Sequence, residues 1–144
     1  MPEIFVFVYG TLMKGGYNHY LLELYDSKLI SEATTTEKFT MISMGSFPAL
    51  LSNGETTIHG EVYSIDERTL SMLDELETPY GYQRRSTWVR AKDTGTLLNV
   101  LCYVSTERLA QLLQRNITLG LLSVVENGRW THVKTQEQAK EIQA

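Results

Sequence analysis

The sequence predicts an α+β fold, a small mixed β-barrel with flanking short helices. Three observations support this fold class. Short stretches rich in valine, isoleucine, threonine and aromatic residues recur along the chain and are separated by turn signals, which is typical of strands. Few stretches have a helical period. The 144 residues, 42% of them hydrophobic, suffice for one buried core, and no repeat, low-complexity tract or linker divides them. We therefore expect one domain over residues 1–144.

Seven stretches carry the strand signal. The first is an apolar run of phenylalanine and valine, which suits a pleated and buried strand. The next two alternate weakly and are rich in threonine and isoleucine. Asn53-Gly54 predicts a hairpin turn in the middle of the series, and Asp93-Thr94-Gly95 predicts the turn before the last strand. The expected strands cover residues 4–9, 28–36, 38–44, 49–51, 56–64, 84–90 and 97–105.

Three stretches are expected to be helical. Asn18 is a suitable N-cap for the first helix, and Ser64 or Asp66 is a suitable N-cap for the second. The third follows the last expected strand, and beyond it the pattern to Ala144 favours neither helix nor strand. The expected helices cover residues 18–25, 66–77 and 106–115.

Composition excludes several functional classes. The formal charge of −4 argues against sequence-independent nucleic-acid binding, which needs a basic surface. Cys102 is the single cysteine, so an intramolecular disulfide and a cysteine-rich zinc site are excluded. No apolar stretch reaches the ~20 residues of a membrane helix. The N-terminus enters a strand almost at once, without the pattern of a signal peptide, so we expect a cytoplasmic protein.

The loop after the first strand is the first candidate site, formed by Tyr9, Gly10, Thr11 and Leu12. Gly10 permits the backbone to leave the strand sharply. Such a loop can direct consecutive backbone N–H groups at one point, which makes a cradle for a carboxylate or an oxyanion. Strand–Gly–Thr turns are common and most bind nothing, so a purely structural loop remains the alternative on these residues alone.

A glutamate at the end of the second helix is the second candidate. With Leu70 as reference, Leu73 lies at about 300° and Glu77 at about 340° around the helix. Glu77 therefore shares the expected inward face, whereas Glu75, at about 140°, faces water. A partly desolvated carboxylate has a raised pKa and can exchange protons near neutral pH. The alternative is that the helix ends before Thr78-Pro79 and that Glu77 lies in solvent.

The remaining candidates have simpler structural interpretations. Tyr82 could offer a hydroxyl to a pocket, although tyrosines at strand starts more often serve packing. His19, His59 and His132 have no ligand-like spacing, so surface or capping roles are expected and no metal site is predicted. Cys102 lies in an apolar strand and is expected to be a small core residue. No serine nucleophile elbow and no Walker-type phosphate loop occur in the sequence.

An ordered set of short motifs resembles the γ-glutamylcyclotransferase-like superfamily, which includes the AIG2-like proteins. The match runs from about residue 4 to 105 of the chain. The threonine of Tyr9-Gly10-Thr11-Leu12 is most similar to the γ-glutamylamine cyclotransferase branch, because the other branches more typically have serine there. The motifs are Val8-Tyr9-Gly10-Thr11-Leu12, Lys14-Gly15, Asn18-His19, Phe47-Pro48-Ala49, Gly60-Glu61-Val62-Tyr63, Leu73-Asp74 with Glu77, and Tyr82-Gln83-Arg84.

The resemblance implies a barrel with a pocket at one end and a function for each candidate residue. The 9–12 loop would hold the carboxylate end of a γ-glutamyl group, Glu77 aligns with the family's general acid/base, and Tyr82 matches a tyrosine of the same pocket. The reaction would release 5-oxoproline and a free amine from a γ-glutamyl amine, with no cofactor. We expect a small-molecule substrate, no nucleic-acid or membrane partner, and a monomer.

Two further points concern function and specificity. The alternative to an enzyme is a non-catalytic binding or interaction module on the same fold, since function depends on the site and not on the fold. A degenerate module would tolerate another residue at position 77, and here it is glutamate. Arg84 and Arg85 are the nearest basic candidates for binding an anionic leaving group, and in an alternating strand at most one of them can reach the pocket.

Overall fold

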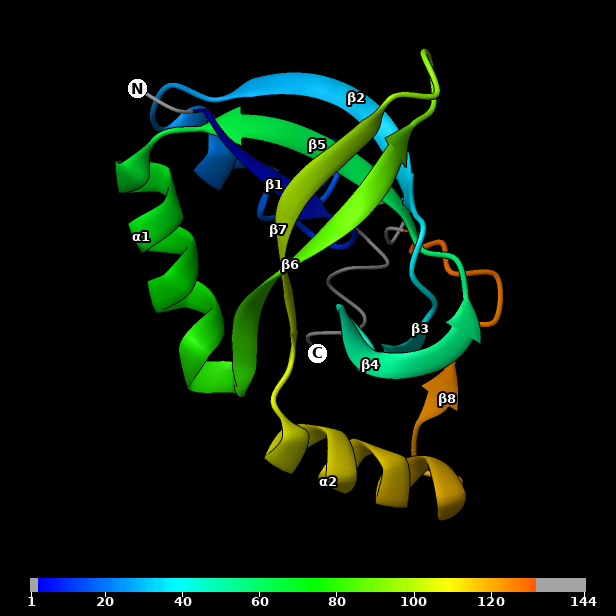
Figure 1. Cartoon of the computed structure of the whole chain (residues 1–144). Helices are drawn as coiled ribbons and strands as arrows, with labels where there is room; N and C mark the ends of the chain where they lie inside the picture. Colours follow the sequence, from blue (N-terminus) through cyan, green and yellow to red (C-terminus); the bar gives the residue numbers. More distant parts are fainter. Residues whose placement is uncertain (1–2, 132–144) are drawn as a thin grey trace.

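The computed structural model describes residues 3–131, and Figure 1 shows a closed barrel flanked by two α-helices and a second, smaller sheet. The expected α+β barrel is confirmed. The expectations for His132 and for the rest of the chain to Ala144 lie outside the described residues. The strands are β1 (Ile4–Val8), β2 (Lys28–Thr35), β3 (Phe39–Ser43), β4 (Pro48–Thr56), β5 (His59–Ile65), β6 (Tyr82–Ala91), β7 (Leu97–Ser105) and β8 (Ser123–Val124). The helices are η1 (His19–Glu23), α1 (Glu67–Glu77), η2 (Thr78–Tyr80) and α2 (Glu107–Thr118).

Five strands close the barrel in the order β1-β5-β2-β6-β7. Neighbours are antiparallel except β1 and β7, which close the barrel as a parallel pair. The remaining strands form a separate sheet in the order β4-β3-β8. Closure removes the free edges that an open sheet would expose.

The first strand is apolar on both faces because each face meets a different part of the core. Val6 and Val8 pack in the cluster that includes Leu73 of α1. Phe7, one position out of phase, packs in the second cluster with residues such as Val62 of β5. The alternation of side chains along a strand explains this division. The continuous apolar run that predicted the strand therefore reflects burial on both sides.

The chain path brings the end of α1 back to the end of β1. The two strands β1 and β5 are antiparallel, with Val8 opposite Glu61 and Ile4 opposite Ile65. β5 therefore ends beside the start of β1. There Asp66 caps α1, its Oδ1 accepting a hydrogen bond from the backbone N–H of Thr69 at 2.9 Å. A helix of 11 residues is about 16 Å long, as is a strand of five residues. The last turn of α1 thus returns to the level at which β1 ends.

The predicted hairpin at Asn53-Gly54 is wrong. β4 runs through both residues to Thr56 and pairs with β3, not with β5. The register shifts between Phe39 and Thr40, so the extra residues of β4 form a bulge. Gly54 does not have the positive φ that a type I′ turn requires. A Cβ on Gly54 would lie 2.2 Å from the backbone of Phe39, so glycine is needed here for close approach.

Two helical predictions also need correction. The first helix is a 3₁₀-helix that ends at Glu23 and not near Tyr25, and Asn18 makes no side-chain capping bond to it. The helix expected at 106–115 begins one residue later and extends to Thr118. Of the two cap candidates for α1, Asp66 is the N-cap and Ser64 lies in β5. No helix among residues 3–131 is long and apolar enough to cross a membrane.

Candidate active site

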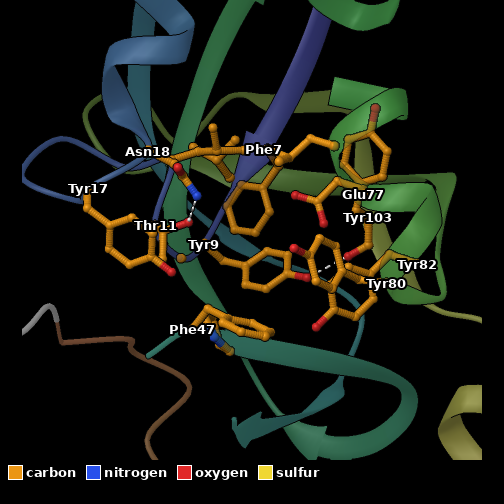
Figure 2. Close-up of a pocket in the computed structure, with 15 residues that line it drawn as sticks. Phe7, Tyr9, Thr11, Tyr17, Asn18, Phe47, Glu77, Tyr80, Tyr82 and Tyr103 are labelled. Atoms are coloured by element: carbon orange, nitrogen blue, oxygen red, sulfur yellow. Dashed lines mark hydrogen bonds between the residues drawn. The ribbon is translucent and has the colours of Figure 1, made fainter. Parts of the chain in front are cut away.

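A pocket of about 280 Å³ opens where β1 ends, and Figure 2 shows the side chains that surround it. Its wall combines the loop after β1, the start of β4, the end of α1 and the first residue of β6. All six residues that the sequence singled out as site candidates line it, and aromatic side chains supply much of the rest of the wall. The lining residues are Phe7, Val8, Tyr9, Gly10, Thr11, Leu12, Tyr17, Asn18, Phe47, Pro48, Leu76, Glu77, Tyr80, Tyr82 and Tyr103.

The loop after β1 has its carbonyl groups satisfied by the protein itself. Each of the three carbonyls of Gly10, Thr11 and Leu12 accepts an internal hydrogen bond. Within residues 3–131, no hydrogen bond uses the backbone N–H of any of these three residues. The loop therefore offers donors and no free acceptors, as an anion site requires. The Gly10 carbonyl accepts from the backbone N–H of Met13 (3.0 Å), the Thr11 carbonyl from the backbone N–H of Asn18 (3.0 Å), and the Leu12 carbonyl from Nδ1 of His19 (2.9 Å).

Asn18 and His19 hold this loop in shape. The Asn18 side chain donates from Nδ2 to Oγ1 of Thr11 at 3.0 Å, and so binds the loop instead of capping η1. His19 bonds the Leu12 carbonyl, and its Nε2 lies 3.2 Å from Glu23. Of the surface and capping roles expected for His19, the structure favours the second, because its side chain is only 19% exposed and bonds the main-chain carbonyl of Leu12. In the sequence, only the Asn18-His19 motif of the family resemblance connected these two residues with the loop.

Gly10 is needed because of what lies against it. Its φ is not positive, so backbone strain does not explain the glycine. A Cβ at this position would lie 2.7 Å from Cγ and Cδ of Pro48, which is closer than real Cβ atoms come. The Phe47-Pro48 motif and the glycine of the loop, distant in sequence, thus pack against each other at the pocket wall.

Glu77 is the last residue of α1 and lies on its buried side. Leu73, one turn earlier, is 0% exposed, and Glu75 is exposed as the helical phase predicted. Figure 2 shows the Glu77 carboxylate directed into the pocket, toward Tyr9 and Tyr82. Burial raises the pKa of this carboxyl from 4.5 to about 7. Glu77 is therefore divided between its acid and base forms at neutral pH.

Three tyrosines surround Glu77. The hydroxyl of Tyr9 donates to the main-chain carbonyl of Tyr103 at 2.6 Å, and the hydroxyl of Tyr103 donates to Oδ1 of Asp74 at 2.6 Å. The Tyr82 hydroxyl makes no hydrogen bond within the described part of the chain. Burial, with the nearby Glu77, raises the pKa of Tyr82 above its usual range, so this hydroxyl keeps its proton.

Neither basic candidate reaches the pocket. Nη1 of Arg84 lies 3.5 Å from Oδ2 of Asp74, and Nη2 of Arg85 lies 2.8 Å from Oε1 of Glu37. The two side chains leave β6 on opposite faces, as alternation predicts. Both pair with carboxylates that are not among the residues lining the cavity, and Glu77 is the one charged side chain among the lining residues that the structure describes.

Cys102 lies in the barrel core and not among the residues that line the pocket. Cys102 is buried in the barrel cluster, and burial raises the pKa of its thiol to about 12. Across residues 3–131, no group of three or more His, Cys, Asp or Glu side chains is arranged to hold a metal ion.

Sequence reasoning missed part of the pocket wall. Tyr17 and Tyr80 lie at its mouth, 57% and 62% exposed, and Phe47 packs edge-on against Tyr80 with ring centroids 6.3 Å apart. Tyr103 comes from a strand that gave no functional signal. Only the three-dimensional arrangement brings these four aromatic residues together.

Comparison with known proteins identifies the family of this chain. The family model described as gamma-glutamyl cyclotransferase, AIG2-like, matches residues 6–132. The chain is 36% identical to the gamma-glutamylcyclotransferase family protein YtfP of Escherichia coli K12 over 113 residues, which cover 65% of this chain and 96% of that protein.

Solved structures show the same fold. An AIG2-like protein from Mus musculus superposes with a TM-score of 0.66 and 26% identity, over 74% of this chain and 79% of that one. YkqA from Bacillus subtilis gives a TM-score of 0.66 and 29% identity, over 90% of this chain and 40% of that one. With the family model matching nearly the whole of the described chain, and the loop and Glu77 on one pocket, the protein belongs to the AIG2-like gamma-glutamyl cyclotransferase family.

Proposed function

We propose that this protein converts a γ-glutamyl amine into 5-oxoproline and a free amine. In this reaction the α-amine of the γ-glutamyl group attacks its own γ-carbonyl carbon, and the bond from that carbon to the amide nitrogen breaks. Both reacting groups belong to one small molecule, so the protein has to fold the substrate and move protons. The observation that carries the proposal is a partly buried carboxylate beside a loop whose N–H groups are unused.

Glu77 acts as general base and then as general acid. As carboxylate it takes a proton from the α-ammonium, which frees the nitrogen lone pair for attack. As carboxylic acid it gives that proton to the departing amine nitrogen. The attacking nitrogen still carries two protons, and the regenerated carboxylate takes one of them and passes it to the released amine, which leaves as an ammonium ion. Both protons lost by the α-ammonium are then on the leaving group, and no cofactor is needed. A pKa of about 7 suits both steps at neutral pH, and such catalysis is typically worth ~10²–10⁴-fold in rate.

The loop and two hydroxyls orient the substrate. The N–H groups of Gly10, Thr11 and Leu12 bind the α-carboxylate. Thr11 Oγ1 accepts a hydrogen bond from Asn18, so its own proton is free to donate to the same carboxylate. The Tyr82 hydroxyl, free of partners within residues 3–131, is available to donate to the γ-carbonyl oxygen as negative charge develops there.

The leaving-group side of the pocket favours an amine over an amino acid or peptide. A leaving group that carries a carboxylate gains from a basic partner. Among the described lining residues none is Lys or Arg, and Arg84 and Arg85 are engaged with carboxylates elsewhere. The mouth is formed by Tyr17, Phe47 and Tyr80, which suit an alkyl chain.

Turnover of a substrate panel tests the proposal. The protein is incubated with a γ-glutamyl alkylamide, a γ-glutamyl dipeptide and glutathione, and 5-oxoproline is assayed. We expect kcat/KM for the amide to exceed that for glutathione by about tenfold or more, because a carboxylate would meet no cation.

Two results would contradict this. A preference for glutathione that disappears in Arg84→Ala or Arg85→Ala would show that a basic side chain does bind the carboxylate of the leaving group. Binding of γ-glutamyl compounds with no 5-oxoproline from any of them would favour the non-catalytic binding module.

A further inference from the structure

We propose that the side-chain hydroxyl of Tyr9 is the hydrogen-bond acceptor that recognises the α-amino group of the γ-glutamyl substrate. The inference rests on the proposed function and extends it from the backbone of the 9–12 loop to a side chain of that loop. It explains how the pocket distinguishes a γ-glutamyl compound from an analogue of the same length that has no α-amine.

The Tyr9 hydroxyl has only acceptor capacity left for a ligand. A phenol has one proton to donate and oxygen lone pairs to accept with. The proton of Tyr9 is committed to the main-chain carbonyl of Tyr103, at 2.6 Å in a buried setting. Tyr103 lies in β7, which pairs with β1 across the closure of the barrel, and Tyr9 directly follows β1, so the pairing of these strands holds the two residues close together.

The position of this hydroxyl matches the chemistry of the amine. Tyr9 lines the pocket, and Figure 2 shows its ring crossing from the loop toward Glu77, Tyr82 and Tyr103. Burial, followed by the charge of Glu77, raises the pKa of Tyr9 well above its usual value. The phenol therefore stays protonated near neutral pH and continues to donate its proton to the Tyr103 carbonyl.

The pocket is thus divided by hydrogen-bond polarity. The loop N–H groups of residues 10–12 only donate, whereas the Tyr9 oxygen and the ionised Glu77 only accept. An α-amino acid head group has the complementary division, because its carboxylate only accepts and its ammonium only donates. When the carboxylate lies on the loop N–H groups and the ammonium lies on the Tyr9 oxygen, the α-ammonium is next to Glu77, which must remove its proton. Tyr9 then sets orientation as well as specificity.

A pair of unreactive ligands tests the assignment. Binding of L-glutamate and of glutarate, which lacks only the α-amine, is measured by calorimetry for the wild type, Tyr9→Phe and Tyr82→Phe. In the wild type, glutamate should bind about tenfold or more tightly than glutarate. Tyr9→Phe should reduce that ratio by about tenfold, whereas Tyr82→Phe, which removes a hydroxyl of the same pocket, should leave it unchanged.

The ratio separates recognition from structural damage, because a distorted pocket would weaken both ligands together. If Tyr9→Phe does not fold, the wild type is tested with N,N,N-trimethylglutamate, which keeps the positive charge but has no N–H to donate. Binding of this compound as tight as that of glutamate would overturn the inference. An unchanged ratio in a folded Tyr9→Phe would also overturn it.

The two proposals fail differently. Release of 5-oxoproline by the wild type together with an unchanged ratio contradicts the role of Tyr9 alone. A wild type that binds neither glutamate nor any γ-glutamyl compound contradicts the proposed function and the role of Tyr9 with it.

Discussion

Ionisation of Glu77 has opposite effects on the stability of this protein and on its proposed chemistry: it lowers the free energy of unfolding, and it supplies the general base. Its carboxyl is covered by the pocket wall, and burial raises its pKa from 4.5 to about 7. The folded state therefore holds this proton more tightly than the unfolded state does. The resulting stabilisation is complete below about pH 4.5 and is lost as the pH rises through about 7. The ionised form that the reaction needs is the form that the fold disfavours.

The first prediction at the residue scale concerns this linkage. Glu77→Gln removes the titration, so its free energy of unfolding should lack the fall that the wild type shows between pH 4.5 and 7. At pH 8 the variant should be more stable than the wild type by up to about 3.5 kcal/mol, because the pKa is raised from 4.5 to about 7 and each pKa unit is worth about 1.4 kcal/mol. Urea denaturation over this pH range measures the difference. Glu75→Gln is the matched control, and equal pH profiles for the two variants would contradict the burial of Glu77.

At the scale of elements, the loop after β1 depends on close contact with β4. The predicted change is Gly10→Ala, whose methyl group would lie 2.7 Å from the Pro48 ring and push the loop away. Binding of L-glutamate should weaken by about tenfold or more, as expected when the N–H groups of an anion site lose alignment. Calorimetry measures this loss. The double variant with Pro48→Ala removes the ring and should recover part of the binding, whereas strictly additive losses would show that crowding is not the cause.

The bulge in β4 gives a second prediction at this scale. Gly54→Ala puts a methyl group 2.2 Å from the Phe39 backbone and should destabilise the fold by about 2 kcal/mol or more. Asn53→Ala, one residue earlier, is the control and should change stability little, because its side chain makes no contact on which the bulge depends. Chemical denaturation of both variants tests this. A larger loss for Asn53→Ala would instead support the hairpin turn that the local sequence indicates.

These elements also show how far the sequence alone predicts this molecule. Periodicity placed Glu77 on the inward face of α1 and most strands within a few residues, because both depend on local pattern. The Asn53-Gly54 signal failed because the glycine serves a contact with Phe39, a residue of the neighbouring strand. For His19 the sequence left surface and capping roles open and did not indicate its partner, because every residue has a main-chain carbonyl and the sequence does not show which one lies close to the ring.

At the scale of the whole molecule, topology brings together the two halves of the site. β1 ends at the loop, β5 runs antiparallel to it, and α1 returns along about the same length, so Glu77 arrives beside Gly10. The separate β4-β3-β8 sheet supplies Pro48, the first residue of β4, and Phe47 directly precedes it; both line the pocket. The aromatic mouth and the polar interior therefore come from four segments that local sequence does not connect.

The central claim is that this fold carries out cyclisation with Glu77 as its acid/base. Its most direct test is the rate of 5-oxoproline release from one γ-glutamyl alkylamide by the wild type, Glu77→Gln and Glu75→Gln, each shown to be folded. We expect Glu77→Gln to lose about 100-fold or more in kcat and Glu75→Gln to keep the wild-type rate, because only the first exchanges protons with the substrate. Equal rates for Glu77→Gln and the wild type, or equal losses in both variants, would contradict the claim.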